Sequence, residues 1–227
     1  MNAAGAPVAV LNGWAARPEA WSLCGFYSRA KIFSYIQQLD GEADAFVRAA
    51  PAKVVVAAWS MGCVNALRLA AECPDKIAGL VLTAATPRLS EDKATGWRGM
   101  SMRRIDALRK GLEATCGKWL FPRDPSMPQP FFLDTPGNLS RGEVFLREAD
   151  VRAVVKDIPA SMPVFIFQSE RDAVVRRECG EWLAGRIPGS VLKTVPGGEH
   201  ALPLSMHAEI TEKVEEIASG RIRKGGQ

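Results

Sequence analysis

Residues 53–62 read KVVVAAWSMG, an apolar run that leads directly into Ser60. The small residues Ala58 and Gly62 stand two positions before and after this serine, where we expect backbones to crowd. Val54–Trp59 has the length and the β-branched content of a buried strand. Met61–Glu72 has the period of a helix, which Pro74 ends. A sharp turn from strand to helix would lift the Ser60 hydroxyl above the end of a sheet, so Ser60 is a candidate nucleophile. From this motif alone, Ser60 could instead simply cap an ordinary helix.

The alternation of strand and helix recurs along the chain. Short apolar runs predict strands at Val8–Leu11, Ile32–Ile36, Val54–Trp59, Ile77–Thr83, Val164–Gln168 and Val191–Val195. Helical periodicity predicts helices at Glu42–Ala50, Met61–Glu72, Arg176–Ile187 and Ser205–Ala218. This pattern indicates an α/β fold with a mostly parallel sheet of about six strands and helices on both faces.

One segment, residues 87–147, contains no predicted strand and is called the insertion below. Ser101 could cap a helix there, whose apolar stripe comprises Ile105, Leu108, Leu112 and Trp119. The passage 121–136 is too rich in proline for regular structure. We therefore predict a core of residues 1–86 and 148–220, a helical cap or lid at 87–147 after the fourth strand, and a flexible tail at 221–227.

Composition limits the class of protein. The chain has 227 residues, 47% of them hydrophobic, which is enough to bury one sizeable core and excludes disorder. Its five cysteines form an odd set without CxxC spacing, and no basic and apolar leader precedes them, so we expect buried free thiols in the cytoplasm. No apolar run approaches the ~20 residues that span a bilayer, so we expect no membrane association.

Metal and nucleotide sites are not predicted. Neither His200 nor His207 has a partner at a metal-ligand spacing, and GxGxxG and GxxxxGK loops are absent from the sequence. We expect no metal and no cofactor.

The net charge of +4 is unevenly placed, because nine basic and five acidic residues lie between Arg88 and Asp124. The rest of the chain is balanced, which argues against a nucleic-acid partner. The excess of positive charge therefore falls within the insertion.

Two further polar residues follow predicted strands. Asp172 lies just beyond Val164–Gln168, and His200 lies beyond Val191–Val195. Serine, aspartate and histidine in this chain order resemble the catalytic residues of the α/β-hydrolase superfamily. In this interpretation Ser60 attacks the substrate, His200 accepts and returns its proton, and Asp172 orients the imidazole.

Other acids and the second histidine offer alternatives. Glu170 competes with Asp172, whereas Glu199 adjoins His200 and is poorly placed to orient it. His207 opens a predicted helix and lacks a loop context, which is typical of a surface or cap histidine. We favour Asp172 because of its position in the loop.

An oxyanion needs two preorganised donors. One candidate is the amide of Met61, directly after the serine. The resemblance implies that the other is the amide of Trp14, in a loop where Asn12 replaces the usual histidine of the superfamily. Asn can also bond backbone groups, so we expect it to brace the loop, and Gly13 permits the tight turn.

Within the superfamily, the sequence resembles the pimeloyl-acyl-carrier-protein methyl ester esterases of biotin synthesis, as a short variant. The motifs are NGW at 12–14, PEAW at 18–21, WSMG at 59–62, TPRL at 86–89 with Trp97, RDAVV at 171–175 and HALP at 200–203. The resemblance implies a cofactor-free serine carboxylesterase that cleaves the methyl ester of pimeloyl-acyl carrier protein. The segment between Trp21 and Val54 is shorter than in that family. A distinct, shortened branch that acts on another substrate is therefore an alternative.

The resemblance also implies a carrier-protein partner. Acyl carrier proteins are acidic, and basic residues of the insertion would steer them, the candidates being Arg103, Arg104, Arg109 and Lys110. A solvated helix face is the alternative. Trp14, Trp59, Phe131, Phe132 and Phe145 could line an acyl pocket, with core packing as the alternative. We expect a monomer.

Other functions are compatible with these residues. A general short-chain carboxylesterase or acyl thioesterase would use the same three groups, as would a haloperoxidase or a C–C hydrolase. A non-catalytic ligand binder on the same fold belongs to a different class, although nothing in the sequence demands it.

Overall fold

The computed structural model describes residues 5–115, 128, 130–131, 134–197 and 199–222. Within them, six strands form one sheet in the order β2-β1-β3-β4-β5-β6, and every neighbouring pair is parallel. The strands are β1 (Val8–Leu11), β2 (Lys31–Phe33), β3 (Val54–Trp59), β4 (Ile77–Thr83), β5 (Val164–Ser169) and β6 (Val191–Val195). The predicted α/β fold with a sheet of about six strands is confirmed.

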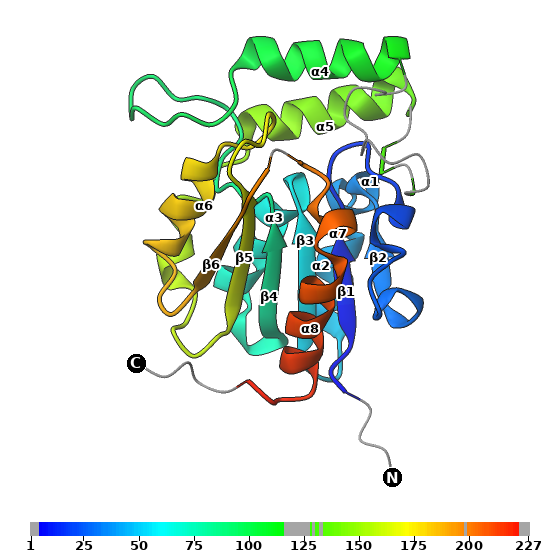
Figure 1. Ribbon diagram of the computed structural model, residues 1–227, viewed down its shortest axis with the longest axis vertical. Helices are drawn as coiled ribbons and strands as arrows, with labels where there is room; N and C mark the ends of the chain where they lie inside the picture. Colours follow the sequence, from blue (N-terminus) through cyan, green and yellow to red (C-terminus); the bar gives the residue numbers. More distant parts are fainter. Residues whose placement is uncertain (1–4, 116–127, 129, 132–133, 198, 223–227) are drawn as a thin grey trace.

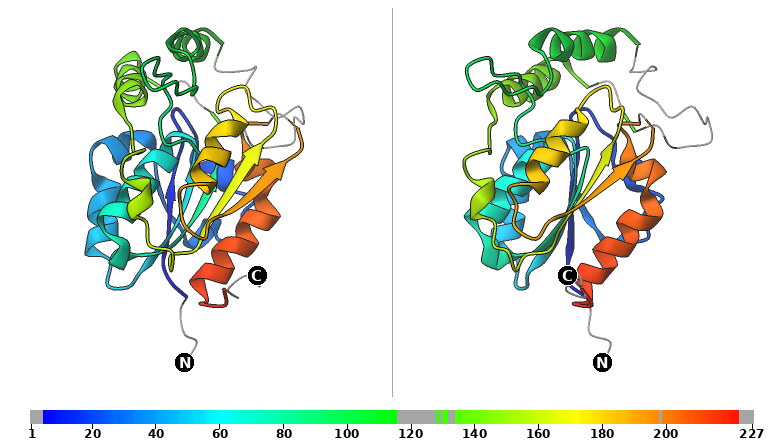
Figure 2. Two further views of the ribbon diagram at one scale, coloured as in Figure 1. Left: turned by 90° about the vertical axis from the view of Figure 1, so that its left-hand side faces the viewer. Right: turned by 60° about the vertical axis from the view of Figure 1, so that its left-hand side comes forward.

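Helices cover both faces of the sheet (Figures 1 and 2). α8 (His207–Ala218) packs on one face, and α2 (Glu42–Ala49), α3 (Met61–Glu72) and α6 (Arg177–Ala184) pack on the other. Alternate residues of β3 therefore enter different cores, with Val55 and Ala57 on the α8 side and Val56 on the α3 side. Burial on both faces explains why β3 reads as one continuous apolar run.

The predicted strand Ile32–Ile36 is too long at its C-terminal end. β2 ends at Phe33, and Ser34 begins the short helix α1 (Tyr35–Leu39). The Ser34 hydroxyl accepts a hydrogen bond from the Gln37 amide, and the Gln37 side chain accepts one from the Ser34 amide. This capping box outweighs the β-branched character of Ile36.

The other predicted elements agree closely with the structure. The predicted helix Arg176–Ile187 ends earlier, at Ala184, and Ser205 belongs to a separate turn, α7 (Leu202–Ser205). Short 3-10 turns lie at Pro18–Trp21, Tyr27–Arg29, Pro74–Lys76 and Val155–Asp157. Among the residues described, no helix is both long and apolar enough to cross a membrane.

The cysteines are free thiols where they are described. Cys24, Cys63 and Cys179 are buried, Cys73 is half-buried, and Cys116 lies outside the described residues. Burial raises the pKa of Cys179 to about 11 and that of Cys24 to about 12. These thiols therefore pack as small apolar groups.

The insertion lies between β4 and β5, and its described residues include the helices α4 (Met102–Thr115) and α5 (Pro136–Glu148). Both lie above the carboxyl ends of the strands (Figure 1). Ile105 and Leu108 are buried, whereas Trp119 and the tail from residue 223 lie outside the described residues. The domain boundaries, and the role of the insertion as a lid, stay predictions.

Helix α5 was not predicted, because the passage before it is rich in proline. The Thr135 hydroxyl accepts a hydrogen bond from the Asn138 amide, and Pro136 occupies the first turn. A threonine followed by proline is a start signal for a helix, so the sequence contained the information.

Ion pairs join the two segments that connect the core to the insertion, one at its start and one at its end. Arg88 Nη1 lies 2.7 Å from Asp92, and Arg152 Nη2 lies 2.6 Å from Asp150 and 3.2 Å from Asp92. Hydrogen bonds from the Thr95 hydroxyl and the Arg152 guanidinium lower the pKa of Asp92 to about 2. The base of the insertion is thus held by a shared network of charges.

Candidate active site

Ser60 occupies a strained turn between β3 and α3. Its backbone has φ 53° and ψ −116°, a conformation that residues other than glycine rarely adopt. The Ser60 amide donates to the Thr83 carbonyl at 3.0 Å, and the Ser60 carbonyl accepts from the Cys63 amide at 2.9 Å. The flanking strand and helix therefore hold the strain in place.

Gly62 is required at this turn by close packing of backbones. A Cβ at this position would lie 2.9 Å from the Asn12 carbonyl oxygen and closer still to that of Leu11. The loop after β1 therefore passes directly beside the start of α3, as the predicted crowding around Ser60 requires.

The three predicted polar residues meet at the carboxyl edge of the sheet. His200 Nε2 lies 3.1 Å from Ser60 Oγ, and His200 Nδ1 lies 2.8 Å from Asp172 Oδ2. All three residues are buried. The competing acid Glu170 is exposed, and His207 Nδ1 lies 2.9 Å from the Leu204 carbonyl.

Asp172 is held by its own loop. Its Oδ1 accepts hydrogen bonds from the amides of Val174 at 2.7 Å and Val175 at 3.0 Å, which leaves Oδ2 facing His200. The buried Gln168 donates from Nε2 to the Val175 carbonyl at 3.0 Å. Gln168 is not among the residues predicted for the site, although a polar residue near the end of a buried strand is a usable signal.

The loop of His200 is fixed through its backbone. Trp59 Nε1 donates to the His200 carbonyl at 2.8 Å, and Ser169 Oγ donates to the Glu199 carbonyl at 2.6 Å. The rings of Trp59 and His200 lie 5.5 Å apart. These backbone contacts were not predicted, because sequence does not show which carbonyl a distant side chain will reach.

The two predicted oxyanion donors lie beside Ser60. A Cβ on Gly13 would lie 3.4 Å from the Ser60 Cβ, so the loop carrying Trp14 runs against the turn. Among the hydrogen bonds of the described residues, none uses the amide of Trp14 or of Met61. Their role as oxyanion donors stays a prediction.

Asn12 braces this loop as expected. Its side chain donates to the Ala16 carbonyl at 3.2 Å and accepts from Trp21 Nε1 at 2.9 Å. Its own carbonyl accepts from Gln38 Nε2 at 2.8 Å, and Asn65 in turn donates to Gln38. Asparagine therefore replaces the histidine of the superfamily with a buried polar network.

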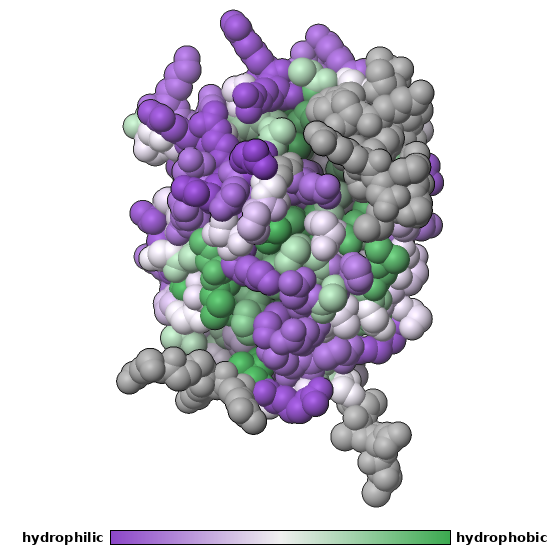
Figure 3. Space-filling view, in the orientation of Figure 1, coloured by the Kyte–Doolittle hydropathy of each residue, from purple (hydrophilic) through white to green (hydrophobic). Residues whose placement is uncertain are grey.

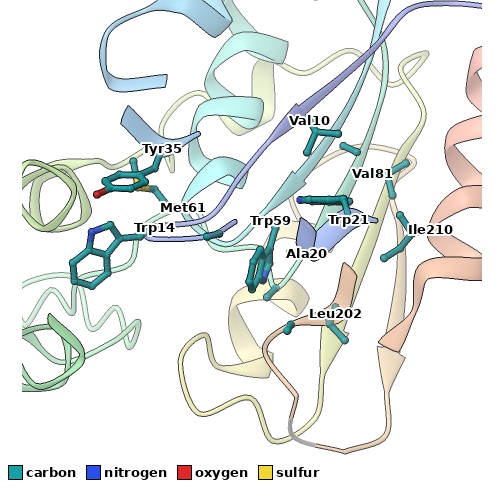
Figure 4. Close-up of a cluster of buried hydrophobic side chains, with 14 of the residues drawn as sticks. Val10, Trp14, Ala20, Trp21, Tyr35, Trp59, Met61, Val81, Leu202 and Ile210 are labelled. Carbon is teal, nitrogen blue, oxygen red and sulfur yellow. The ribbon is translucent and has the colours of Figure 1, made fainter. Parts of the chain in front are cut away.

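A narrow apolar pocket, with a free volume of about 30 Å³, lies beside Ser60. Trp59 and Phe131 form one wall, with ring centroids 5.2 Å apart, and Figure 4 shows Trp14 and Trp59 in the hydrophobic cluster that borders it. The lining residues are Gly13, Trp14, Trp59, Ser60, Leu89, Met100, Ile105, Leu108, Phe131, Leu146, Val174 and His200. Phe132 lies outside the described residues.

The sequence profile described as the alpha/beta hydrolase family matches residues 10–213. The chain belongs to this family. Two relatives named pimeloyl-[acyl-carrier protein] methyl ester esterase confirm the resemblance seen in the sequence. The one from Chromobacterium violaceum is 31% identical over 78% of this chain and 74% of its own length. The one from Methylococcus capsulatus is 31% identical over 80% and 77%.

Solved structures confirm the fold of this hydrolase. An esterase from Exiguobacterium antarcticum superimposes with a TM-score of 0.74, covering 95% of this chain and 92% of its own, at 17% identity. A hydrolase from Oleispira antarctica gives a TM-score of 0.71, covering 94% and 91%, also at 17% identity.

The basic residues of the hydrolase's insertion have different surroundings. Arg103 and Arg104 are exposed, and the side chain of Lys110 is 66% exposed beside Asp106. Arg109 instead turns inward, with Nε 3.0 Å from the mostly buried carboxylate of Glu143. Its guanidinium joins α4 to α5, so the proposed docking surface below consists of Arg103, Arg104 and Lys110.

Proposed function

We propose that this hydrolase is a serine carboxylesterase that cleaves the methyl ester of pimeloyl-acyl carrier protein, with Ser60 as nucleophile. The observation that carries the proposal is the contact of Ser60 with His200, and of His200 with Asp172, beneath an apolar cavity. The names of the two relatives supply the substrate.

The reaction proceeds in two balanced steps. Ser60 Oγ attacks the ester carbonyl carbon while His200 Nε2 takes the hydroxyl proton, and the amides of Trp14 and Met61 receive the oxyanion. Collapse of this intermediate breaks the bond to methanol, which leaves with the proton from His200. Water then attacks the acyl-enzyme by the same route and releases the carboxylic acid and free Ser60.

Asp172 supports both steps without changing its own protonation. Its Oδ2 fixes His200 with Nδ1 protonated, so that Nε2 is the acceptor that faces Ser60. The negative charge of Asp172 stabilises the imidazolium that forms during attack, and this stabilisation is stronger because the site is buried.

The residues around the pocket and on α4 support a substrate whose acyl chain is attached to an acidic carrier protein. The cavity walls are apolar and suit a neutral methyl ester and its methylene chain. Hydrophilic side chains dominate the end of the molecule over α4, which carries the docking surface of Arg103, Arg104 and Lys110 (Figure 3). Positive charge here would raise the rate of encounter with an acidic partner and orient it.

The test is demethylation of purified pimeloyl-carrier-protein methyl ester by the wild type, by Ser60→Ala and by a double charge reversal, Arg103→Glu with Arg104→Glu. We expect turnover by the wild type, none by Ser60→Ala, and a lower kcat/KM for the charge reversal at low salt. Absence of turnover with this ester overturns the substrate assignment.

Two controls separate the alternative functions. Hydrolysis of p-nitrophenyl esters without turnover of the carrier-bound ester indicates a general carboxylesterase. Failure of a fluorophosphonate probe to label Ser60 indicates a non-catalytic binder.

A further inference from the structure

The loop that carries the Trp14 amide touches the insertion at two separate places. This loop, residues 12–17 and called the oxyanion loop below, follows β1 in the core. One contact is with helix α5, and the other is with residues 130–131. The sequence predicts that the insertion is a lid that docks the carrier protein and lines the acyl pocket. Contact with the oxyanion loop assigns it a further task.

The first contact is between Trp14 and Gly142, a glycine within α5. A Cβ at position 142 would lie 2.5 Å from both Cδ1 and Nε1 of the indole, so the ring rests directly on the helix backbone. Trp14 is 8% exposed, and its Nε1 has no hydrogen-bond partner within the described structure. Packing against α5, and not a hydrogen bond, therefore sets the position of this side chain.

The second contact is a short backbone pairing. The Arg17 amide donates to the Pro130 carbonyl at 2.7 Å, and Ala16 and Phe131 form an antiparallel bridge. Arg17 Nε also donates to the Phe131 carbonyl at 3.0 Å. The pairing thus ties the oxyanion loop to the residue whose ring packs on Trp59.

Strain between the two contacts shows why such support is needed. Ala15 lies between Trp14 and Ala16 and has a φ of 52°, in the left-handed region that residues other than glycine rarely adopt. Such a backbone persists only when its neighbours hold it. Within the loop, the Ala16 amide donates to Gly13 at 3.2 Å, and the insertion holds both sides of Ala15.

We propose that Arg17 and Gly142 are positioning residues for the oxyanion amide of Trp14, so that the insertion completes the catalytic geometry as well as the substrate pocket. The inference rests on the serine esterase mechanism proposed above. Donors must lie within a few tenths of an ångström of their best position, and a misplacement of about 1 Å can cost roughly 100-fold in rate.

The test compares Gly142→Ala and Arg17→Ala with two matched controls. Gly137→Ala changes another glycine of α5, around which a Cβ would meet nothing within 4 Å. Arg141→Ala removes a different tie between insertion and core, the 2.5 Å ion pair with Asp40. The substrate is p-nitrophenyl acetate, which is small and needs no carrier protein.

We expect kcat to fall about 10- to 100-fold in Gly142→Ala and about 10-fold in Arg17→Ala, with KM changed less than about threefold. The Ki of a phenylboronic acid, whose tetrahedral adduct places an oxygen between the two amides, should rise by a similar factor. Both controls should stay within about twofold of the wild type.

Each outcome decides between explanations. Wild-type kcat and Ki in both Gly142→Ala and Arg17→Ala overturn the inference while leaving the esterase proposal intact. An equal loss in Arg141→Ala also overturns it, because general loosening of the insertion would then be the cause. If Gly142→Ala does not fold, Arg17→Ala carries the decision. A wild type that is inactive on both p-nitrophenyl acetate and the carrier-bound methyl ester refutes the proposed esterase activity. An active wild type whose Gly142→Ala and Arg17→Ala variants are normal refutes only the positioning role.

Discussion

Trp59 Nε1 donates a 2.8 Å hydrogen bond to the main-chain carbonyl oxygen of His200. The residue directly before the proposed nucleophile thereby holds the loop that carries the proposed base. Both groups are buried, and the bond joins the end of β3 to the loop after β6, which carry two of the three proposed catalytic residues.

Replacement of Trp59 by phenylalanine should loosen this link. Trp59→Phe keeps an aromatic ring against Phe131 but leaves the His200 carbonyl without its donor. We expect a loss of about 1–3 kcal/mol in the free energy of unfolding and a fall in kcat of about tenfold. Urea unfolding and ester hydrolysis measure the two effects. Trp182→Phe, on α6 and outside the cavity lining, is the control and should change kcat less than about twofold.

The two candidate acids can be separated by isosteric substitution. Asp172→Asn should lower kcat by roughly 10³- to 10⁴-fold, because the imidazole loses its orientation and its counter-charge. Glu170→Gln should leave kcat nearly unchanged, because Glu170 is exposed and does not contact His200. Steady-state kinetics on one ester tests both, and a large effect at Glu170 with none at Asp172 reverses the assignment.

Gly62→Ala should disrupt the turn at Ser60. The added methyl would collide with backbone carbonyls of the loop after β1, which cannot move away as a side chain can. We expect the free energy of unfolding to fall by about 3 kcal/mol or more, together with loss of activity. Gly137→Ala should instead be neutral or slightly stabilising, since the methyl meets open space on a helix. Denaturant unfolding curves of both variants are the measurement.

The ion pairs at the base of the insertion predict a pH dependence. The pKa of Asp92 is lowered from 3.8 to about 2, so its contribution to stability is full above its unfolded pKa and is lost as the pH falls toward 2. Asp92→Asn should have a lower Tm than the wild type at pH 5–7. The difference should shrink between about pH 4 and pH 2.

A matched variant checks that this effect is local. Asp157→Asn changes an exposed acid of the core for which no ion pair is seen among the described residues. Its Tm should follow the wild type at every pH. A difference between Asp92→Asn and the wild type that persists unchanged at pH 2 would contradict the proposed role of the charge.

Hydrophobic periodicity and the order of the motifs predicted most of the fold. They also predicted that Ser60, Asp172 and His200 lie close together. These features succeed because burial on both faces of a parallel sheet leaves a continuous apolar run, and the loops after such strands share one edge. The predictions failed where a local signal competes with hydrophobicity. Ser34 ended β2 early, and Thr135 with Pro136 began α5 inside a passage that looked irregular.

Contacts between distant segments were beyond the sequence pattern. Arg109 shares the charge and spacing of its neighbours on α4, but the buried Glu143 on α5 draws it inward. The same limit applies to Gln168 and Ser169, whose partners are backbone carbonyls of other loops. The packing of distant segments decides which polar groups form contacts. Residue type and spacing in the sequence do not show that packing.

The order of the strands has a consequence for redesign. The chain builds outward from β1 to β2, then returns and builds in the other direction from β3, so the segments after β1 and β3 meet where the direction of the sheet reverses. Both proposed oxyanion amides belong to these two segments, so their neighbourhood is a property of the strand order and not of the insertion. A hydrolase given a different insertion between β4 and β5 would thus keep the proposed nucleophile in place. To keep the same rate, the new insertion would also need a glycine where the Trp14 ring packs and two backbone carbonyls that accept the hydrogen bonds of Arg17.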